Sequence, residues 1–543
     1  MILLLLSSVL ILSVLAGWGQ IMERFCGSLF DGISGSILTG ILGISLLWTV
    51  LAFFIPINIY VEIPFIMAGV FFFFKKRSYR KINQFSKKDA VLIGSISMVI
   101  FYASSFHPYI LDHFGYYVPT IKWLTEYGMV KGIANLDLTL GQMSVWHIFQ
   151  AGFSGFSDPF LRINAVLLVL YTVYIFEKKS WIQLCFIPVL LLFSQSPSPD
   201  LPVITLSLII LNEIIKGNKN IGLLFAYSVF VFSIKPTMIW LPLLVFLCSV
   251  FIFKPNYKNW ILGTGILILF FIKNIYTFGY PLFPVAAADL GFSWKPNPEI
   301  LKISSQYAIQ KTYDMQYTHE EIQKFSFYDS IRNWFILDGI KSKINIIFII
   351  SLAVFSVFAF IKKKKMITLI CISILIKSML VLAFSAQYRF FIDVFFVIFF
   401  VLFAHCNKRN SIIFFSVSSV LVIGILSFPN FIRQYVPSFR PGNFMVGFKK
   451  EQLYRPSTYH YKRFETFRTG NLQFNVSKNY PFNFDNPIPA ISAGYISDDV
   501  KAGIFPQYTD EKNIRKGFIW KKLTPQEKKQ AQDIINTIKN TDQ

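Results

Sequence analysis

Asp112 is the residue whose type and setting best suit a general base in this sequence. It lies in the stretch ILDHFGYY, six residues beyond the end of a strongly apolar run at 90–106. Partial burial among apolar neighbours raises the basicity of a carboxylate, and a nearby cation restrains that shift. Asp112 is therefore our candidate for removing a proton from a hydroxyl group. A helix cap or a polar residue at the membrane surface is the alternative, and the local sequence leaves it open.

Several basic residues lie at or inside the ends of apolar stretches on the side where we place Asp112. They are Arg162, Lys235, Lys273, Lys377 and Arg389. Lys235 follows an apolar run directly in SIKPT, and Arg389 stands in AQYRF, where its planar guanidinium suits bidentate phosphate binding. Such a collection of cations indicates an anionic ligand that arrives from the membrane plane. Snorkelling of these long side chains to the membrane surface is an equally good interpretation for Lys235 and Arg389.

The composition predicts a membrane protein built from helices. Hydrophobic residues make up 54% of the 543, the chain contains 60 Phe, and the mean hydropathy is +0.52. The apolar runs are continuous rather than alternating, which favours helices over a β-barrel. We therefore expect an all-α polytopic membrane protein with about 14 transmembrane helices. The expected helices are 2–19, 33–55, 59–74, 90–106, 160–176, 181–195, 200–215, 220–234, 237–253, 260–278, 344–361, 366–384, 390–405 and 411–428.

The distribution of basic residues predicts the orientation. The net charge is +23, but Lys and Arg gather in six short loops that all fall on one side of this arrangement, which we assign to the cytoplasm. This pattern explains the charge without a nucleic-acid partner. The expected parts are transmembrane helices in 1–106, 160–278 and 344–428, extracytoplasmic loops in 107–159 and 279–343, and a small extracytoplasmic C-terminal region in 429–543.

The loop 107–159 contains two amphipathic stretches behind Asp112. Tyr117–Tyr127 has a helical pattern that Gly128 is placed to end, and Ser144–Phe156 is short and aromatic. We expect both to lie at the membrane surface or to dip into it. In the C-terminal region, Thr524–Lys539 has the pattern of a polar amphipathic helix with Pro525 at its start.

Motifs for cofactor chemistry are missing from the sequence. It contains no P-loop, dinucleotide fingerprint, H-E-x-x-H or G-x-S-x-G motif, and its five Cys include no C-x-x-C pair. We predict no cofactor, and we leave a divalent metal as an open possibility.

The chain resembles bacterial polytopic membrane proteins allied to the GT-C glycosyltransferase superfamily. The resemblance rests on Asp112 with Tyr116-Tyr117, and on the blocks 121–128, 134–141, 234–236, 273–284 and 294–295. Three extra apolar runs precede the loop that carries Asp112, and Asp137 and Thr139 stand where relatives have a His and Arg pair.

This resemblance implies an inverting glycosyltransferase of the bacterial inner membrane, multi-pass, with its site and C-terminus on the extracytoplasmic face. The donor would be a polyprenyl-phosphate-linked sugar, the acceptor a glycan, lipid or protein, and membrane lipids would surround the site. Asp112 would be the catalytic base. The substrate-binding residues would be Lys235, Arg389, Lys273, Arg162 and Tyr117.

Two other functions compete with this one. An O-antigen-type polymerase or ligase would depend on outer arginines more than on Asp112. A polysaccharide-precursor flippase or transporter would need charges in the middle of the membrane and often has repeated halves. Lys377 is the deep charge late in the chain, and no repeat is visible, so we favour transfer over transport.

Overall fold

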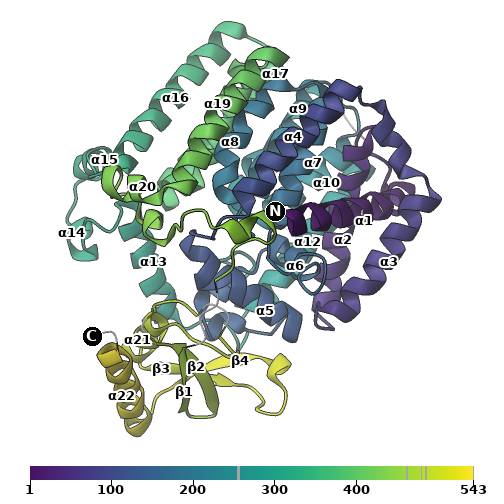
Figure 1. The fold of residues 1–543 in the computed structure, drawn as a ribbon. Helices are drawn as coiled ribbons and strands as arrows, with labels where there is room; N and C mark the ends of the chain where they lie inside the picture. Colours follow the sequence, from purple (N-terminus) through teal and green to yellow (C-terminus); the bar gives the residue numbers. More distant parts are fainter. Residues whose placement is uncertain (254–256, 460–462, 479, 484–485, 542–543) are drawn as a thin grey trace.

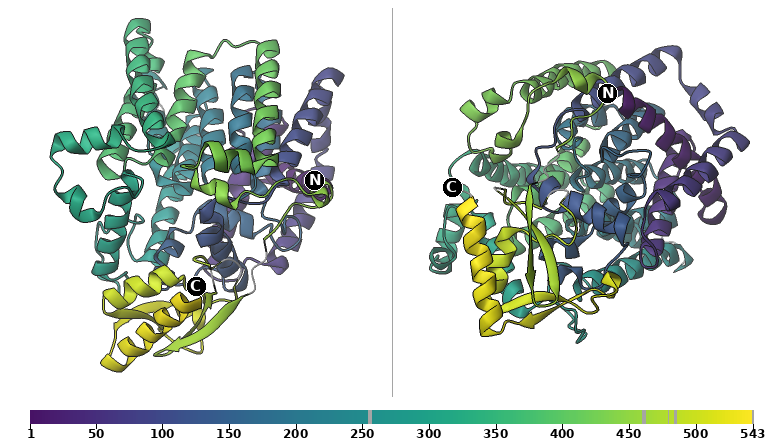
Figure 2. Two further views of the ribbon diagram at one scale, coloured as in Figure 1. Left: turned by 60° about the vertical axis from the view of Figure 1, so that its left-hand side comes forward. Right: turned by 60° about the horizontal axis from the view of Figure 1, so that its bottom comes forward.

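The computed structural model describes residues 1–541 except 254–256, 460–462, 479 and 484–485, and omits the side chains of 539–541. The chain forms a large helical bundle with a small α/β unit at one end (Figures 1 and 2). The first four helices are α1 (Ile2–Cys26), α2 (Ile33–Ala52), α3 (Ile59–Lys75) and α4 (Lys87–Ser104). The next loop holds α5 (Val118–Glu126) and α6 (Val145–Ala151).

The middle of the bundle continues with six helices. These are α7 (Ile163–Lys178), α8 (Ile187–Leu190), α9 (Asp200–Ile215), α10 (Ile221–Ile234), α11 (Trp240–Cys248) and α12 (Ile261–Phe278). A second long loop forms an arm of three helices, α13 (Pro298–Thr312), α14 (His319–Gln323) and α15 (Phe327–Phe335). The bundle ends with α16 (Ile340–Lys362), α17 (Lys365–Phe384), α18 (Ile392–Leu402), α19 (Lys408–Ser427) and α20 (Pro429–Tyr435).

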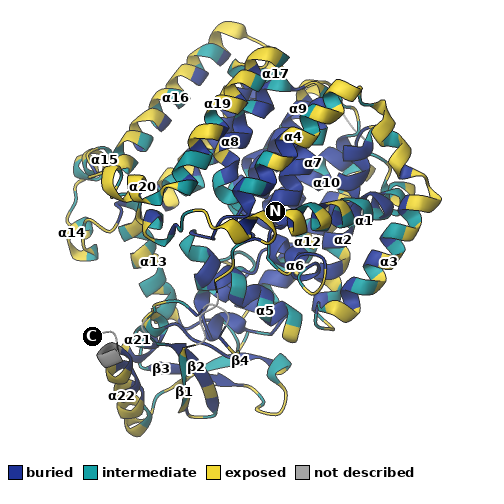
Figure 3. Ribbon diagram, in the orientation of Figure 1, coloured by how far each residue is buried: buried dark blue, intermediate teal, exposed yellow. Residues whose placement is uncertain are grey.

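Helical structure occupies each of the expected apolar segments. Seven helices of the described chain are long and apolar enough to cross a membrane: α1, α2, α16, α17, α19, and α11 and α12 with their flanking turns. The outer helices α16 and α19 carry many exposed residues, whereas α7, α9 and α10 are largely buried inside the bundle (Figure 3). Several of the exposed residues of α16 and α19 are apolar. These features support a polytopic helical membrane protein, and the number of fourteen crossings remains a prediction.

Small residues let the first helices pack closely. A Cβ added at Gly40 of α2 would lie 2.0 Å from the carbonyl oxygen of Leu15 in α1, and one at Gly17 would lie 1.8 Å from the carbonyl oxygen of Gly69 in α3. Contacts this short are possible only for glycine. Helices in membranes commonly associate through such small residues, because backbone packing replaces the hydrophobic driving force.

The basic loops meet at one end of the bundle. Lys408 Nζ pairs with Asp89 at 2.5 Å, and Gln84 Nε2 donates to Glu177 Oε1 at 2.6 Å. At the opposite end, the amino group of Met1 donates to the carbonyl oxygen of Gln452 at 2.6 Å. The start of the chain therefore lies against the C-terminal region, away from the basic loops.

The two stretches behind Asp112 are helical, but the structure buries them more than expected. α5 spans Val118–Glu126, and Gly128 follows it with a φ of +77°, as predicted for a helix terminator. Every residue of α6 is buried, whereas we expected a helix that lies at the membrane surface or dips into it. The structure corrects that expectation, because α6 packs against α2 and α5 inside the protein.

The C-terminal region contains strands, so "all-α" describes the bundle alone. β1 (Phe464–Thr469) pairs antiparallel with β2 (Leu472–Ser477), and β3 (Ile504–Tyr508) pairs antiparallel with β4 (Phe518–Lys522). The helices here are α21 (Ala493–Lys501) and α22 (Pro525–Thr541). The predicted amphipathic helix is thus present. Phe518 N donates to the carbonyl oxygen of Lys131 at 3.0 Å, which holds β4 against the loop behind Asp112.

Candidate functional site

Asp112 directly precedes a π-helical turn, His113–Tyr117, which continues into α5. π-Helical turns are rare and occur frequently at functional sites. The Asp112 Oδ2 accepts a hydrogen bond from Arg389 Nη1 at 3.2 Å, and the two side chains are 36% and 39% exposed. An ion pair with this exposure contributes little to stability. Its partly open position leaves it accessible to a ligand.

Arg389 lies in a short turn, Tyr388–Phe390, between α17 and α18. Gln387 Oε1 accepts a hydrogen bond from its Nε at 3.1 Å, and the ring of Phe390 lies 5.0 Å from the guanidinium carbon. Burial lowers the pKa of Arg389, but the charge of Asp112 and of its neighbours outweighs burial and raises it. The guanidinium is thus charged and oriented toward Asp112.

Lys235 joins this pair from a third part of the chain. It follows α10 with an extended backbone, as residues before proline prefer. Its Nζ forms an ion pair with Asp200 and donates to the carbonyl oxygen of Arg389 at 3.1 Å. Three of the predicted site residues therefore meet. Asp200 was missed by sequence analysis, although it ends the outer turn SPSPD, whose position next to an apolar run was the available signal.

Lys311 is a second residue that the sequence did not mark. It lies near the end of α13, which Ser385 anchors by donating from Oγ to the carbonyl oxygen of Ala308 at 3.1 Å. Burial and the charge of Arg389 lower the pKa of Lys311, while Asp112 raises it. Lys311 therefore lies within electrostatic range of the Asp112–Arg389 pair. No motif or apolar flank distinguishes Lys311 from other lysines of this loop.

Tyr117 lies beneath the pair rather than on the open surface. It is 1% exposed, and its ring lies 4.6 Å from that of Tyr116 and 4.9 Å from that of His147. Burial raises the pKa of Tyr117 well above its usual value, and the charges of Tyr116, Asp112 and Asp200 raise it further. Tyr117 is therefore a neutral phenol that packs close to the two carboxylates.

The side chains of Arg162 and Lys273 donate hydrogen bonds to backbone carbonyl oxygens and do not point toward the Asp112–Arg389 pair. Arg162 is 1% exposed and donates to the carbonyl oxygens of Ser104 at 2.9 Å and Ser457 at 2.7 Å. Lys273 is also 1% exposed, and its Nζ donates to the carbonyl oxygen of Met143 at 2.8 Å. These cations join outer loops to helix ends. The structure gives them structural contacts and does not bring them to Asp112.

A third ion pair lies deeper in the bundle. Lys377 of α17 is fully buried and pairs with Asp393 of α18, whose other oxygen accepts a hydrogen bond from Trp240 Nε1 at 2.9 Å. Lys377 also interacts electrostatically with Lys235 and Asp200. The ion pairs therefore extend from the partly open site of Asp112 and Arg389 to the buried pair of Lys377 and Asp393.

The site residues, as arranged here, do not fit a divalent metal. Asp112 pairs with Arg389, and Asp200 pairs with Lys235, so a cation would have to displace both partners. Within the described part of the chain, no three His, Cys, Asp or Glu side chains are grouped to hold a metal ion.

The comparison with protein families matches the larger part of the chain. The model of a family described as a domain of unknown function (DUF8201) matches residues 1–396, a range that includes Asp112, Lys235, Lys311 and Arg389. No curated protein and no solved structure matches the chain. The protein belongs to the DUF8201 family.

Proposed function

We propose that this protein is a membrane glycosyltransferase that moves a sugar from a polyprenyl-phosphate donor to a hydroxyl group of a glycan, lipid or protein acceptor. The observation that carries the proposal is the meeting of Asp112, Lys235 and Arg389 at one partly open site. A carboxylate beside two cations supplies a base and a phosphate-binding group. The resemblance to the GT-C superfamily agrees with these roles, and membership of the DUF8201 family specifies no reaction.

In the proposed reaction, Asp112 accepts the proton of the acceptor hydroxyl. The oxygen then attacks the anomeric carbon of the donor sugar, and the bond from that carbon to the phosphate oxygen breaks. The polyprenyl phosphate leaves with the bonding electrons, and the sugar is transferred with inversion. Lys235 and Arg389 stabilise the charge that develops on the phosphate, which is the usual role of preorganised cations at such a site. The bond between the sugar and the phosphate of the donor supplies the activation, so no nucleotide is required.

Binding of the donor would change the contacts of Arg389. The donor phosphate competes with Asp112 for the guanidinium, and this releases the carboxylate to act as a base. Lys311 lies on α13, an element of the outer arm, and adds a third positive charge near the same place. The neutral Tyr116 and Tyr117 limit water beneath the carboxylate.

The arrangement of the loops supports an extracytoplasmic site. The basic loops lie at the end of the bundle opposite the Met1–Gln452 contact, and basic loops of membrane proteins face the cytoplasm. With fourteen crossings, both termini fall on the extracytoplasmic side of a bacterial inner membrane. Lys501→Cys should react with a membrane-impermeant maleimide in intact spheroplasts, whereas Lys364→Cys should react only after lysis. The reverse labelling pattern refutes this orientation.

The proposal is tested by Asp112→Asn, which keeps the size of the side chain and removes the base. Purified protein in proteoliposomes is given a panel of radiolabelled polyprenyl-phosphate hexoses with envelope extract as the acceptor. We expect a loss of roughly 10²- to 10⁴-fold in transfer, the range for a general base. Asp289→Asn, a change to an exposed carboxylate of the second outer loop, serves as the matched control and should leave transfer unchanged. Full activity of Asp112→Asn refutes the assigned base.

The deep pair of Lys377 and Asp393 favours transport as a second candidate function, because buried charges mark ion and substrate pathways in transporters. A fluorescent lipid-linked sugar in proteoliposomes separates the two. Movement between leaflets without sugar transfer, retained in Asp112→Asn, favours a flippase. Transfer that survives Asp112→Asn but is lost in Arg389→Ala favours a polymerase or ligase of the O-antigen type.

A further inference from the structure

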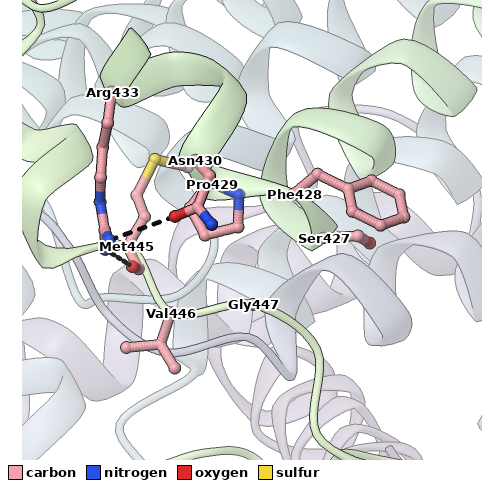
Figure 4. Close-up of a pocket in the computed structure, with 8 residues that line it drawn as sticks. All are labelled: Ser427, Phe428, Pro429, Asn430, Arg433, Met445, Val446 and Gly447. Carbon is pink, nitrogen blue, oxygen red and sulfur yellow. Dashed lines mark hydrogen bonds between the residues drawn. The ribbon is translucent and has the colours of Figure 1, made fainter.

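A cavity lies beside the outer end of α19, in the part of the chain beyond the family match. Its volume is about 420 Å³, and its walls are the end of α19, the start of α20 and the segment 445–447 (Figure 4). The lining is mostly apolar, and the volume falls within the range of small-molecule sites. None of its residues takes part in the reaction proposed above.

The surface of α19 that leads from the middle of this helix to the cavity is suited to a lipid tail. Val417, Val420 and Leu421 are 58%, 69% and 64% exposed, which is unfavourable in water and favourable against acyl chains. From Val417 to Ser427, the helix rises roughly 15 Å, which is about half of the ~30 Å hydrocarbon core. A lipid of the outer leaflet that covers this face therefore has its headgroup at the level of the cavity.

Aromatic side chains lie next to the cavity, at the end of α19. Phe428, Phe431 and Tyr435 follow α19 and are exposed. Aromatic residues are enriched where a protein passes from the hydrocarbon core to the headgroup region. The cavity thus opens at the boundary where phosphates of lipids are found.

Arg433 provides the cavity with a fixed positive charge. Its Nε donates to the carbonyl oxygen of Gly442 at 3.2 Å, its Nη2 to that of Met445 at 2.7 Å, and its Nη1 to Asn430 Oδ1 at 3.4 Å (Figure 4 shows the last two). These acceptors are neutral, and within the described residues no carboxylate forms an ion pair with Arg433. An arginine has five N–H groups, so donors remain for an anion.

The surrounding segment has the charge that complements an anionic headgroup. Residues 428–455 contain one acidic residue, Glu451. The basic residues in the same range are Arg433, Arg440, Lys449, Lys450 and Arg455. Clusters of basic residues at a membrane surface attract anionic lipids, at about 1 kcal/mol for each residue near the surface.

We propose that this cavity binds one anionic phospholipid of the outer leaflet, with an acyl chain along α19 and its phosphate on Arg433. The site is separate from the Asp112 site and does not depend on sugar transfer. It predicts a preference for phosphatidylglycerol over phosphatidylcholine of the same acyl chains. The charge of Arg433 supplies the preference, and the cavity supplies the position.

The experiment is lipid titration of the full-length protein in detergent, followed by native mass spectrometry. We expect wild type to retain one phosphatidylglycerol at concentrations where phosphatidylcholine is lost. Arg433→Gln should weaken this retention about fivefold or more, which corresponds to about 1 kcal/mol. Arg440→Gln, a change to an exposed arginine of the same segment that does not line the cavity, is the matched control. It removes part of the general attraction for anionic lipids but no contact in the cavity, so it should weaken retention less than Arg433→Gln does.

Two further variants keep the test decisive if Arg433→Gln unfolds. Arg433→Lys retains the charge and should retain the preference for phosphatidylglycerol. Val446→Phe enlarges a lining side chain without changing the charge and should weaken binding of the lipid. Soluble glycerol phosphate should not displace the lipid. Equal loss in Arg433→Gln and Arg440→Gln, equal retention of both lipids, or displacement by glycerol phosphate overturns the proposal.

Discussion

The buried pair of Lys377 and Asp393 allows a quantitative test of the packing between α17 and α18. Lys377 is fully buried, Asp393 is 4% exposed, and the carboxylate also accepts the indole N–H of Trp240. Changing Lys377 to Met removes one partner and leaves a buried carboxylate. Changing Asp393 to Leu leaves a buried ammonium group and an indole N–H without its acceptor.

The expected loss in the free energy of unfolding differs between these variants, and the structure gives the reasons. Breaking a buried ion pair costs about 3–5 kcal/mol, because the remaining charge is left without compensation. Lys377→Met should fall at the lower end, since Asp393 lies in the first turn of α18, where the helix dipole favours a negative charge. Asp393→Leu should fall at the upper end, because an unpaired buried donor adds about 1–3 kcal/mol. The double variant Lys377→Met/Asp393→Asn keeps an acceptor for Trp240 and should lie within about 1.5 kcal/mol of wild type.

The measurement is equilibrium unfolding in mixed micelles, followed by tryptophan fluorescence and circular dichroism. The double-mutant cycle consists of Lys377→Met, Asp393→Asn and the double variant, and it gives the coupling between the two side chains. With each single variant at about 3 kcal/mol or more and the double variant at about 1.5 kcal/mol or less, we expect a coupling of about 4.5 kcal/mol or more. Single variants within about 1 kcal/mol of wild type would show that water or lipid headgroups solvate the pair, which contradicts its burial. If the double variant is as unstable as the sum of the singles, the cost comes from packing and the electrostatic reasoning is refuted.

Two other predictions concern the frame around the site. Gly40→Leu should separate α1 from α2 and lower the thermal midpoint in detergent by several degrees. Gly94→Leu in α4 should not, because no atom of a packed neighbour lies within 4 Å of the added Cβ. Equal midpoints for the two variants would contradict the close packing of α1 on α2. Arg162→Met should remove the arginine donors from the buried carbonyl oxygen of Ser104 and the half-buried one of Ser457, and a buried acceptor without a donor costs about 1–3 kcal/mol. Limited proteolysis should then cut near Ser457 sooner than in wild type, and an unchanged cleavage rate would refute the structural role of Arg162.

The fold of the bundle was largely predictable, and that of the C-terminal region was not. Long apolar runs must form helices in a membrane, because the backbone groups have no other partners there. In the C-terminal region, the hairpin of β1 and β2 has a local signal, since Gly470-Asn471 separates two six-residue strands and Gly470 has a φ of +59°. The β3–β4 pair has a longer connection, and its docking on Lys131 depends on tertiary contact.

The candidate site shows the same division. Lys235 and Arg389 could be singled out because a charge beside an apolar run is expensive and therefore informative. The same rule selected Arg162 and Lys273, which the structure directs at backbone carbonyls. Local sequence cannot separate these cases, because the neighbouring residues are apolar in all of them.

The sequence by itself determined the long apolar helices of this protein and predicts that its basic loops share one side, because hydrophobicity and charge act on each segment separately. Tertiary structure alone decided that Arg389 contacts both Asp112 and Lys235, that Asp200 pairs with Lys235, and that Lys311 lies within electrostatic range of them. It also decided that Arg433 lines a cavity at the end of α19. These are contacts between segments far apart in the chain. Their partners depend on how the helices pack, and no single segment contains that information.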